Sequence, residues 1–283
     1  MRENIRYFVP ATVQEAVKLL AENAGKAAVI SGGTDIMIDV RSGKFTGDCL
    51  VDVSRIPELK EIKRDGDAIS IGAAVTIEQL AKSPLLQAEL PAMAQAGINF
   101  AGRQIRNTGT IGGNVAHASP SGDTQPSLVL YEGEAVVASP SGERRQPVTE
   151  LFAGANKSAL GESDLIVRFI LKPHKAKFQC FEKIGRRKDR AISRVSLARL
   201  RDQDDSGAFS EARVSLGACK PTTGRMPKTE AFLLGKKPSL AVFREAAKTM
   251  SAEMIETTGR RKSVFYKEPA IEGLLVRMLL PLL

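Results

Sequence analysis

The sequence predicts an α+β protein with two domains, and three observations support this. The chain has 283 residues, of which 43% are hydrophobic, which is enough for two domains of ordinary size. Helix and strand patterns alternate over about residues 1–175, where the basic, proline-containing stretch 172–177 ends the alternation. The remainder, 176–283, predicts a three-stranded antiparallel sheet and helices, with strands Phe178 to Ile184, Val195 to Leu200 and Ala212 to Cys219 and helices at about 227–234, 239–257 and 267–280.

The first 55 residues predict a small β-α-β-β-like unit, which we treat as one subdomain of residues 1–175. Thr12-Val13-Gln14-Glu15 is a capping box, and apolar residues then recur at helical spacing until Gly25 ends the helix. Ala27 to Ile30 is typical of a short buried strand. Apolar residues at 36–40 predict another short element, and Cys49 to Val53 predicts a further strand.

Residues 56–175 predict a second subdomain of strands and helices. Ala68 to Gly72 alternates like a half-buried strand, and Thr76-Ile77-Glu78-Gln79 is a second capping box. Pro91 to Ala101 is rich in alanine and predicts a helix. The small, polar segment Ala116 to Asp123 predicts a loop long enough to wrap a ligand. A hairpin around 139–143 and a strand over 164–171 complete the subdomain.

Two glycine turns are the strongest functional signal in the sequence. Ser31-Gly32-Gly33-Thr34-Asp35 and Thr110-Ile111-Gly112-Gly113-Asn114 each place paired glycines beside a hydroxyl and a short polar side chain. Paired glycines let backbone N–H groups converge on an anion and let the anion approach closely, so two such turns suggest a clamp on a diphosphate. Neither G-x-G-x-x-G nor G-x-x-x-x-G-K-[ST] occurs. Plain strand-to-helix turns are the alternative, because single Gly-Gly turns are common.

Cysteine and histidine usage excludes several kinds of site. Cys49, Cys180 and Cys219 are odd in number and widely separated, and the chain has two histidines, His117 and His174. This set is unsuited to a disulfide framework, a four-ligand zinc site or an iron–sulfur cluster. The sequence has no apolar run long enough for a membrane helix and no signal-peptide core after Met1, so we expect a cytoplasmic protein without a membrane span.

The net charge is +9, and the basic clusters are Arg186-Arg187-Lys188-Asp189-Arg190 and Arg260-Arg261-Lys262, both in the second half of the chain. A groove that binds a nucleic-acid strand has aromatic side chains between its cations, but here aromatic residues are only 5% and Trp is absent. We therefore interpret the clusters as solvated surface or as a face for a protein partner, ahead of a bound anion or nucleic acid.

Three stretches together resemble the FAD-binding subunit of the molybdenum hydroxylases. They are Gly32-Gly33-Thr34-Asp35, the segment Arg106 to Asn114 with Asp123 nine residues on, and Phe181 to Arg187. This family includes the medium subunit of carbon monoxide dehydrogenase and the flavin part of xanthine dehydrogenase. The resemblance spans nearly the whole chain and implies an FAD-binding domain of the p-cresol methylhydroxylase and vanillyl-alcohol oxidase type, followed by the family's C-terminal flavoprotein domain.

The resemblance also implies which residues contact FAD. The two turns would hold the diphosphate, Phe100 would flank the cofactor, Asp123 would form a hydrogen bond to it, Ile166 would be an apolar contact, and Lys183 would be a basic residue near the site. Without the family, Phe100 and Ile166 are typical core residues, Asp123 a turn carboxylate and Lys183 a surface cation. The implied set is Val29, Ile30, Ser31, Gly32, Gly33, Thr34, Asp35, Ile36, Phe100, Thr110, Ile111, Gly112, Gly113, Asn114, Asp123, Ile166 and Lys183.

By the same resemblance the chain would carry electrons and would not touch the organic substrate. A large partner subunit would hold the molybdenum cofactor, a small one would hold two [2Fe–2S] clusters, and FAD on this chain would collect their electrons. We nominate no general acid or base here, and interpret His117 as a loop hydrogen-bonder. The last 26 residues most resemble xanthine dehydrogenase-type members, which suggests NAD as acceptor; carbon monoxide, aldehyde and other N-heterocycle dehydrogenases are alternatives. A stand-alone flavin oxidoreductase and a non-catalytic basic binding module are more remote.

Overall fold

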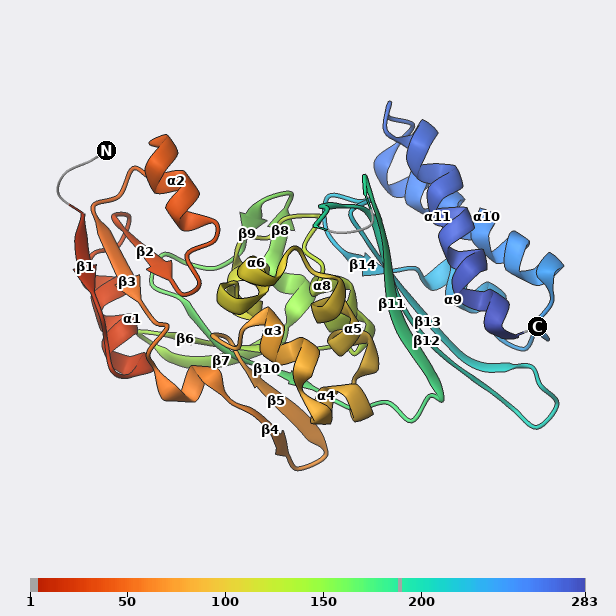
Figure 1. Cartoon of the computed structure of the whole chain (residues 1–283), viewed down its shortest axis with the longest axis horizontal. Coiled ribbons are helices and arrows are strands. Elements are labelled where there is room, and N and C mark those ends of the chain that lie inside the picture. The colour runs from red at the N-terminus through yellow and green to blue at the C-terminus, as the bar shows by residue number, and fades with distance from the viewer. Residues whose placement is uncertain (1–4, 188–189, 283) are drawn as a thin grey trace.

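The N-terminal unit is a three-stranded parallel sheet with two helices. A computed structural model of the chain describes residues 5–187 and 190–282 (Figure 1). The strand order is β1-β3-β2, and both outer strands run parallel to β3. The predicted β-α-β-β-like unit includes a strand before the first helix, but we could not assign its residues, because β1 has only three residues and two of them are exposed. The elements are β1 (Arg6–Phe8), α1 (Val13–Glu22), β2 (Ala27–Ile30), α2 (Ile36–Ser42) and β3 (Cys49–Asp52).

A five-stranded antiparallel sheet forms the centre of the molecule, in the order β4-β5-β10-β6-β7. Its strands are β4 (Ile62–Asp65), β5 (Ala68–Gly72), β6 (Glu134–Ser139), β7 (Gly142–Pro147) and β10 (Leu165–Leu171). The helices of this part are α3 (Ile77–Lys82), α4 (Pro84–Glu89), α5 (Pro91–Asn99), α6 (Arg103–Thr108), α7 (Ile111–Ala116) and α8 (Gln125–Leu130), with 3₁₀ turns at Pro57–Lys60 and Val148–Leu151 and a small hairpin of β8 (Phe152–Gly154) and β9 (Lys157–Ser158).

The central sheet separates two hydrophobic cores. Ile166 and Phe169 of β10 lie in the core beneath α3, α5 and α8. Leu165 and Val167 lie in the other core, which contains the apolar face of α1. A register shift between Ile166 and Arg168 interrupts the regular alternation of side chains along the strand. One strand therefore contributes to both cores, and its N-terminal end carries Ile166.

The C-terminal part contains a four-stranded antiparallel sheet, so our prediction of three strands was one short. The additional strand is β14, whose two residues pair with β13 and carry no strand pattern of their own. One face of the sheet packs on the helices that follow it, and Leu200 on the other face packs in the core of the central region. The elements are β11 (Phe178–Gly185), β12 (Ser193–Gln203), β13 (Phe209–Gly217), β14 (Gly224–Arg225), α9 (Pro227–Leu233), α10 (Leu240–Thr258), α11 (Val264–Leu279) and a 3₁₀ turn at Leu280–Leu282.

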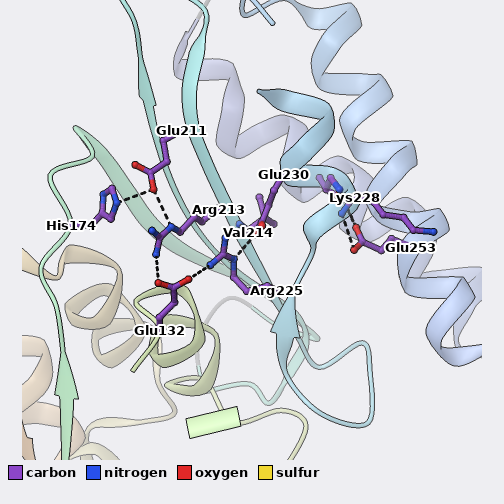
Figure 2. A network of polar contacts seen from close by, with 10 residues as sticks. Glu132, His174, Glu211, Arg213, Val214, Arg225, Lys228, Glu230 and Glu253 are labelled. Atoms are coloured by element: carbon purple, nitrogen blue, oxygen red, sulfur yellow. Dashed lines mark hydrogen bonds and ion pairs between the residues drawn. The ribbon is translucent and has the colours of Figure 1, made fainter. Parts of the chain in front are cut away.

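A chain of charged side chains also joins the two parts (Figure 2). The Glu132 carboxylate, in the turn after α8, lies 3.0 Å from Arg213 and 3.1 Å from Arg225. Glu211 lies between Arg213, at 3.0 Å, and Nε2 of His174, at 2.8 Å. Nδ1 of His174 accepts a hydrogen bond from the N–H of Ala176, so the connecting segment is fixed to the second sheet.

Nothing in the described part of the chain has the length and apolar composition of a membrane-crossing helix.

Candidate functional site

Both glycine turns line one cavity of about 310 Å³, although about eighty residues separate them in the sequence. The cavity lies between the N-terminal unit and the central sheet, and α2, α7 and the start of β10 contribute to its wall. Its size lies at the lower end of the range for small-molecule sites. The lining residues are Val29, Ser31, Gly32, Gly33, Thr34, Asp35, Ile36, Asp39, Val53, Ala73, Ala74, Phe100, Gly109, Thr110, Gly112, Gly113, Asn114, Ala116, His117, Leu160, Asp164, Leu165 and Ile166.

The first turn leaves its backbone donors free. β2 ends at Ile30, and Gly33 adopts a φ of 70°, which a side chain would disfavour. Within the described residues, the N–H groups of Gly32, Gly33, Thr34 and Asp35 donate no hydrogen bond. The Oγ atom of Ser31 is also buried without a partner there. Buried polar groups are nearly always paired, so this turn is suited to a polar ligand.

The second turn uses its backbone donors within the protein. The N–H of Gly112 donates to the Ala73 carbonyl at 2.8 Å, and that of Ile111 to the Val75 carbonyl at 3.0 Å. The Thr110 Oγ caps α7 by accepting from the Gly113 N–H at 3.2 Å. We expected N–H groups from both turns to face an anion; at these three residues of the second turn this is wrong. The Thr110 hydroxyl accepts this hydrogen bond, so its own proton can still be donated to a ligand. Gly113 and Asn114 also border the cavity.

Gly32 brings the two turns into contact. A Cβ atom at Gly32 would lie 1.9 Å from the Thr108 carbonyl oxygen, just before the second turn. Only glycine permits this approach. Gly113 differs, because a Cβ there would meet one atom within 4 Å, the Thr110 Oγ at 3.1 Å. A larger side chain at Gly113 would therefore extend into open space beside the cavity.

Carboxylates line the cavity, and no lysine or arginine is among its lining residues in the described part of the chain. Asp35 and Asp39 lie one turn apart on α2, and the Asp35 side chain does not cap the helix. Asp164 is bound by both terminal nitrogens of Arg144, at 3.0 and 2.6 Å, and this hydrogen bonding lowers the pKa of Asp164 despite its partial burial. An anion in this cavity would have to be held by N–H and hydroxyl groups.

Four residues of the implied set do not line the cavity: Ile30, Ile111, Asp123 and Lys183. Ile30 and Ile111 are buried behind the two turns. The Asp123 carboxylate binds the Lys183 ammonium at 2.6 Å and the Ser193 hydroxyl at 2.5 Å. Burial raises the pKa of Asp123, and its two partners oppose this rise. This structure therefore places Asp123 and Lys183 in a link between the loop after α7 and β11, outside the cavity wall.

Sequence reasoning missed ten of the lining residues. Asp39 was predictable in principle, because it lies four residues after Asp35 on the same helix face. Ala73 and Ala74 line the cavity directly after the end of β5, where no local sequence pattern marks a functional site. The His117 side chain forms no hydrogen bond with the described residues, so our interpretation of it as a loop hydrogen-bonder has no support here. The missed set is Asp39, Val53, Ala73, Ala74, Gly109, Ala116, His117, Leu160, Asp164 and Leu165.

Fold and site together indicate a protein that binds an anionic ligand between two subdomains. A parallel unit and an antiparallel sheet enclose the cavity, and a second α+β domain follows. A loop of free N–H groups after a strand is a typical anion-binding device.

Comparison with known proteins identifies the family. The family model of the FAD binding domain in molybdopterin dehydrogenase matches residues 3–173, and that of the CO dehydrogenase flavoprotein C-terminal domain matches residues 179–282. The chain belongs to this family: it is the FAD subunit of a molybdenum hydroxylase, an oxidoreductase in whose complexes molybdenum and iron–sulfur centres lie on other subunits.

Individual relatives match over most of their length. The nicotinate dehydrogenase FAD-subunit of Eubacterium barkeri is 27% identical over 99% of this chain and 97% of the relative. The putative xanthine dehydrogenase FAD-binding subunit of Escherichia coli is 32% identical over 79% and 77%. Among solved structures, a carbon monoxide dehydrogenase from Hydrogenophaga pseudoflava that lacks the Mo-pyranopterin moiety has a TM-score of 0.90 at 28% identity, with 98% and 96% of the two chains covered.

Proposed function

We propose that this chain binds FAD in the cavity between its two glycine turns and transfers electrons from the [2Fe–2S] clusters of a small subunit to NAD or another acceptor. The observation that carries the proposal is the set of unpaired N–H groups in the first turn, next to the unpaired Ser31 Oγ. These groups fit the diphosphate of FAD, whose oxygens can accept several hydrogen bonds.

Different residues around the cavity would then contact different parts of the cofactor. The N–H groups from Gly32 to Asp35 would hold the diphosphate, and Thr110 would add its hydroxyl proton. Val29, Phe100 and Ile166 would offer an apolar wall to the rings. The Asp35 carboxylate would avoid the diphosphate and accept hydrogen bonds from sugar or ribityl hydroxyls. Asp123 and Lys183 would act indirectly, by fixing the loop that follows α7.

FAD supplies the redox chemistry when bound, because it can exchange electrons singly and in pairs; the protein positions it and limits access to it. The chain would therefore need no general acid or base. It would depend on a small iron–sulfur subunit and a large molybdenum subunit. We also propose a division into domains at residues 1–175 and 176–283, which the family matches to 3–173 and 179–282 support.

The substrate class is an N-heterocycle in this proposal. Xanthine dehydrogenase-type chemistry with NAD as acceptor is our first choice, and it is supported by the relative at 32% identity. Nicotinate oxidation is a second candidate, because the nicotinate dehydrogenase relative covers 99% of the chain. The three cysteines are free, which favours the cytoplasm as the location of the assembly.

Two measurements test the proposal. The purified chain should show the visible absorption of oxidised flavin and release FAD on denaturation. The intact assembly should then reduce NAD with hypoxanthine, xanthine or nicotinate. A colourless chain that takes up no FAD would refute the cofactor site. A yellow assembly that is inactive on all three substrates, with NAD and with an artificial electron acceptor, would refute the substrate class alone.

A further inference from the structure

Asn114, at the end of the second glycine turn, carries the only amide side chain on the cavity wall in the described part of the chain. Its backbone N–H donates to the Thr110 carbonyl at 3.0 Å and is therefore used within the protein. Its side-chain Oδ1 accepts a hydrogen bond from the Thr124 hydroxyl at 2.7 Å. The protons on Nδ2 have no acceptor among the described residues, so they are available to a ligand in the cavity.

Thr124 determines which end of this amide stays free. The residue is fully buried and occupies the N-cap position of α8. A threonine at an N-cap usually accepts a hydrogen bond from the first turn of its helix, but this hydroxyl makes no such bond and donates to Asn114 instead. Because that bond engages Oδ1, the opposite end of the amide, with its two donor protons, is left unpaired.

Gln125 fixes the backbone of the same loop. It is 1% exposed, and its Nε2 donates to the Ser119 carbonyl at 3.0 Å and to the Asn114 carbonyl at 3.4 Å. Its Oε1 accepts from the Thr223 hydroxyl of the second domain at 3.1 Å. A Cβ atom at Gly122 would lie 2.5 Å from the Gln125 Nε2 and 3.1 Å from the Asn114 Oδ1, so a side chain there would push these amides apart. The loop is thus closed on itself and tied to the second domain.

We propose that Thr124 and Gln125 are positioning residues, which orient the Asn114 amide so that its protons face the diphosphate of the cofactor. The proposal rests on the proposed function, since it requires FAD in the cavity. Backbone N–H groups of the second turn are used inside the protein, so an anion beside this turn depends on side-chain donors. Without the bond from Thr124 the amide could turn its oxygen toward the diphosphate, where two negative partial charges would repel each other.

The test is a fluorescence titration of the whole apoprotein with FAD. Thr124→Val keeps the shape of the side chain and removes the hydroxyl, so FAD affinity should fall by about tenfold, and Thr124→Ser should restore it. In an Asn114→Ala background, Thr124→Val should have no further effect on FAD affinity, because Thr124 acts through that amide. A merely structural role would give the same loss in both backgrounds.

Asn114→Asp gives an independent measurement on a residue at the cavity surface. The new side chain keeps an acceptor for Thr124 but replaces the two donor protons by a second acceptor, so FAD affinity should fall further than in Asn114→Ala. If Thr124→Val does not fold, this comparison decides.

Thr229→Val is the matched control. Thr229 is also fully buried, and its hydroxyl donates to the Glu253 carboxylate at 3.0 Å in the second domain. This variant should lower the melting temperature of the apoprotein and leave FAD affinity unchanged.

Three results would overturn the positioning role: wild-type FAD affinity in Thr124→Val, equal losses from this substitution in both backgrounds, or wild-type FAD affinity in Asn114→Asp. A wild-type chain that takes up no FAD would instead refute the proposed function, and the positioning role with it.

Discussion

The two glycine turns have similar sequences but different physical roles. In the first turn the N–H groups from Gly32 to Asp35 have no acceptor within the described residues, and the Ser31 hydroxyl is buried unpaired. In the second turn Ile111, Gly112 and Gly113 all donate hydrogen bonds inside the protein. The donors of the first turn are therefore free to bind a ligand, whereas those of the second turn fix the turn to the rest of the protein. A glycine pair indicates close backbone approach, but its surroundings decide whether a ligand or another segment makes that approach.

The largest expected effect is that of Gly32→Ala. The added Cβ would lie 1.9 Å from the Thr108 carbonyl oxygen, so the turns must separate. We expect FAD retention to fall below detection and the apoprotein to lose about 1–3 kcal/mol of unfolding free energy, as measured by flavin content and urea denaturation.

Gly43→Ala is the matched control. Gly43 has a φ of 74°, but a Cβ added there would meet no atom within 4 Å, so this variant should lose some stability and keep its FAD. Full flavin occupancy in Gly32→Ala would mean that contact between the turns is not required for binding.

The next largest effect separates the two glycines of the second turn. In Gly113→Val the new side chain would project beside the cavity and crowd the diphosphate, so we expect FAD affinity to fall by about 100-fold or more at nearly unchanged apoprotein stability. In Gly112→Ala the Cβ would lie 2.7 Å from that of Ala73, so stability should fall first.

Fluorescence titration with FAD and thermal unfolding of the apoprotein measure both quantities. If the two variants exchanged these effects, or if Gly113→Val kept all its flavin, the second turn would be misassigned.

A smaller pair of effects compares the two hydroxyl residues. Ser31→Ala removes an unpaired donor, so FAD affinity should fall by about fivefold to tenfold while the apoprotein keeps its stability. Thr110→Ala removes the cap of α7, so unfolding free energy should fall by about 1 kcal/mol. Isothermal titration and urea denaturation of both variants provide the comparison. Equal loss of apoprotein stability in both would contradict the division of roles.

Local patterns predicted the elements but not the partners of the second turn. The Thr12 and Thr76 N-caps and the helices they begin were predicted correctly, because capping and periodicity act within a few residues. The full capping box forms only at Thr76, since the Glu15 side chain accepts from the N–H of Ala11 and not from that of Thr12. β14 and the residues of β1 were missed because pairing across the chain, and not their own residues, creates these strands. The N–H groups of the second turn donate to the carbonyl groups of Ala73 and Val75. These two residues lie almost forty residues earlier in the chain, where no local pattern marks them as partners.

The acidic wall of the cavity gives the smallest effect and the only one that depends on pH. Hydrogen bonds from Arg144 lower the pKa of Asp164, so the carboxylate binds its proton more weakly in the folded protein than in the unfolded chain. Its stabilisation is therefore fully present above the unfolded pKa of about 3.9 and is lost as pH falls through the folded value. Arg144 is 40% exposed, so solvent limits the contribution to about 1 kcal/mol or less.

Asp164→Asn should lower apoprotein stability by that amount at pH 7, and the difference from wild type should shrink below about pH 4, as measured by urea denaturation across pH. Because the first turn holds the anion without help from Asp164 in this scheme, FAD affinity at pH 7 should change less in Asp164→Asn than in Ser31→Ala, and a larger loss would place Asp164 in direct contact with the cofactor.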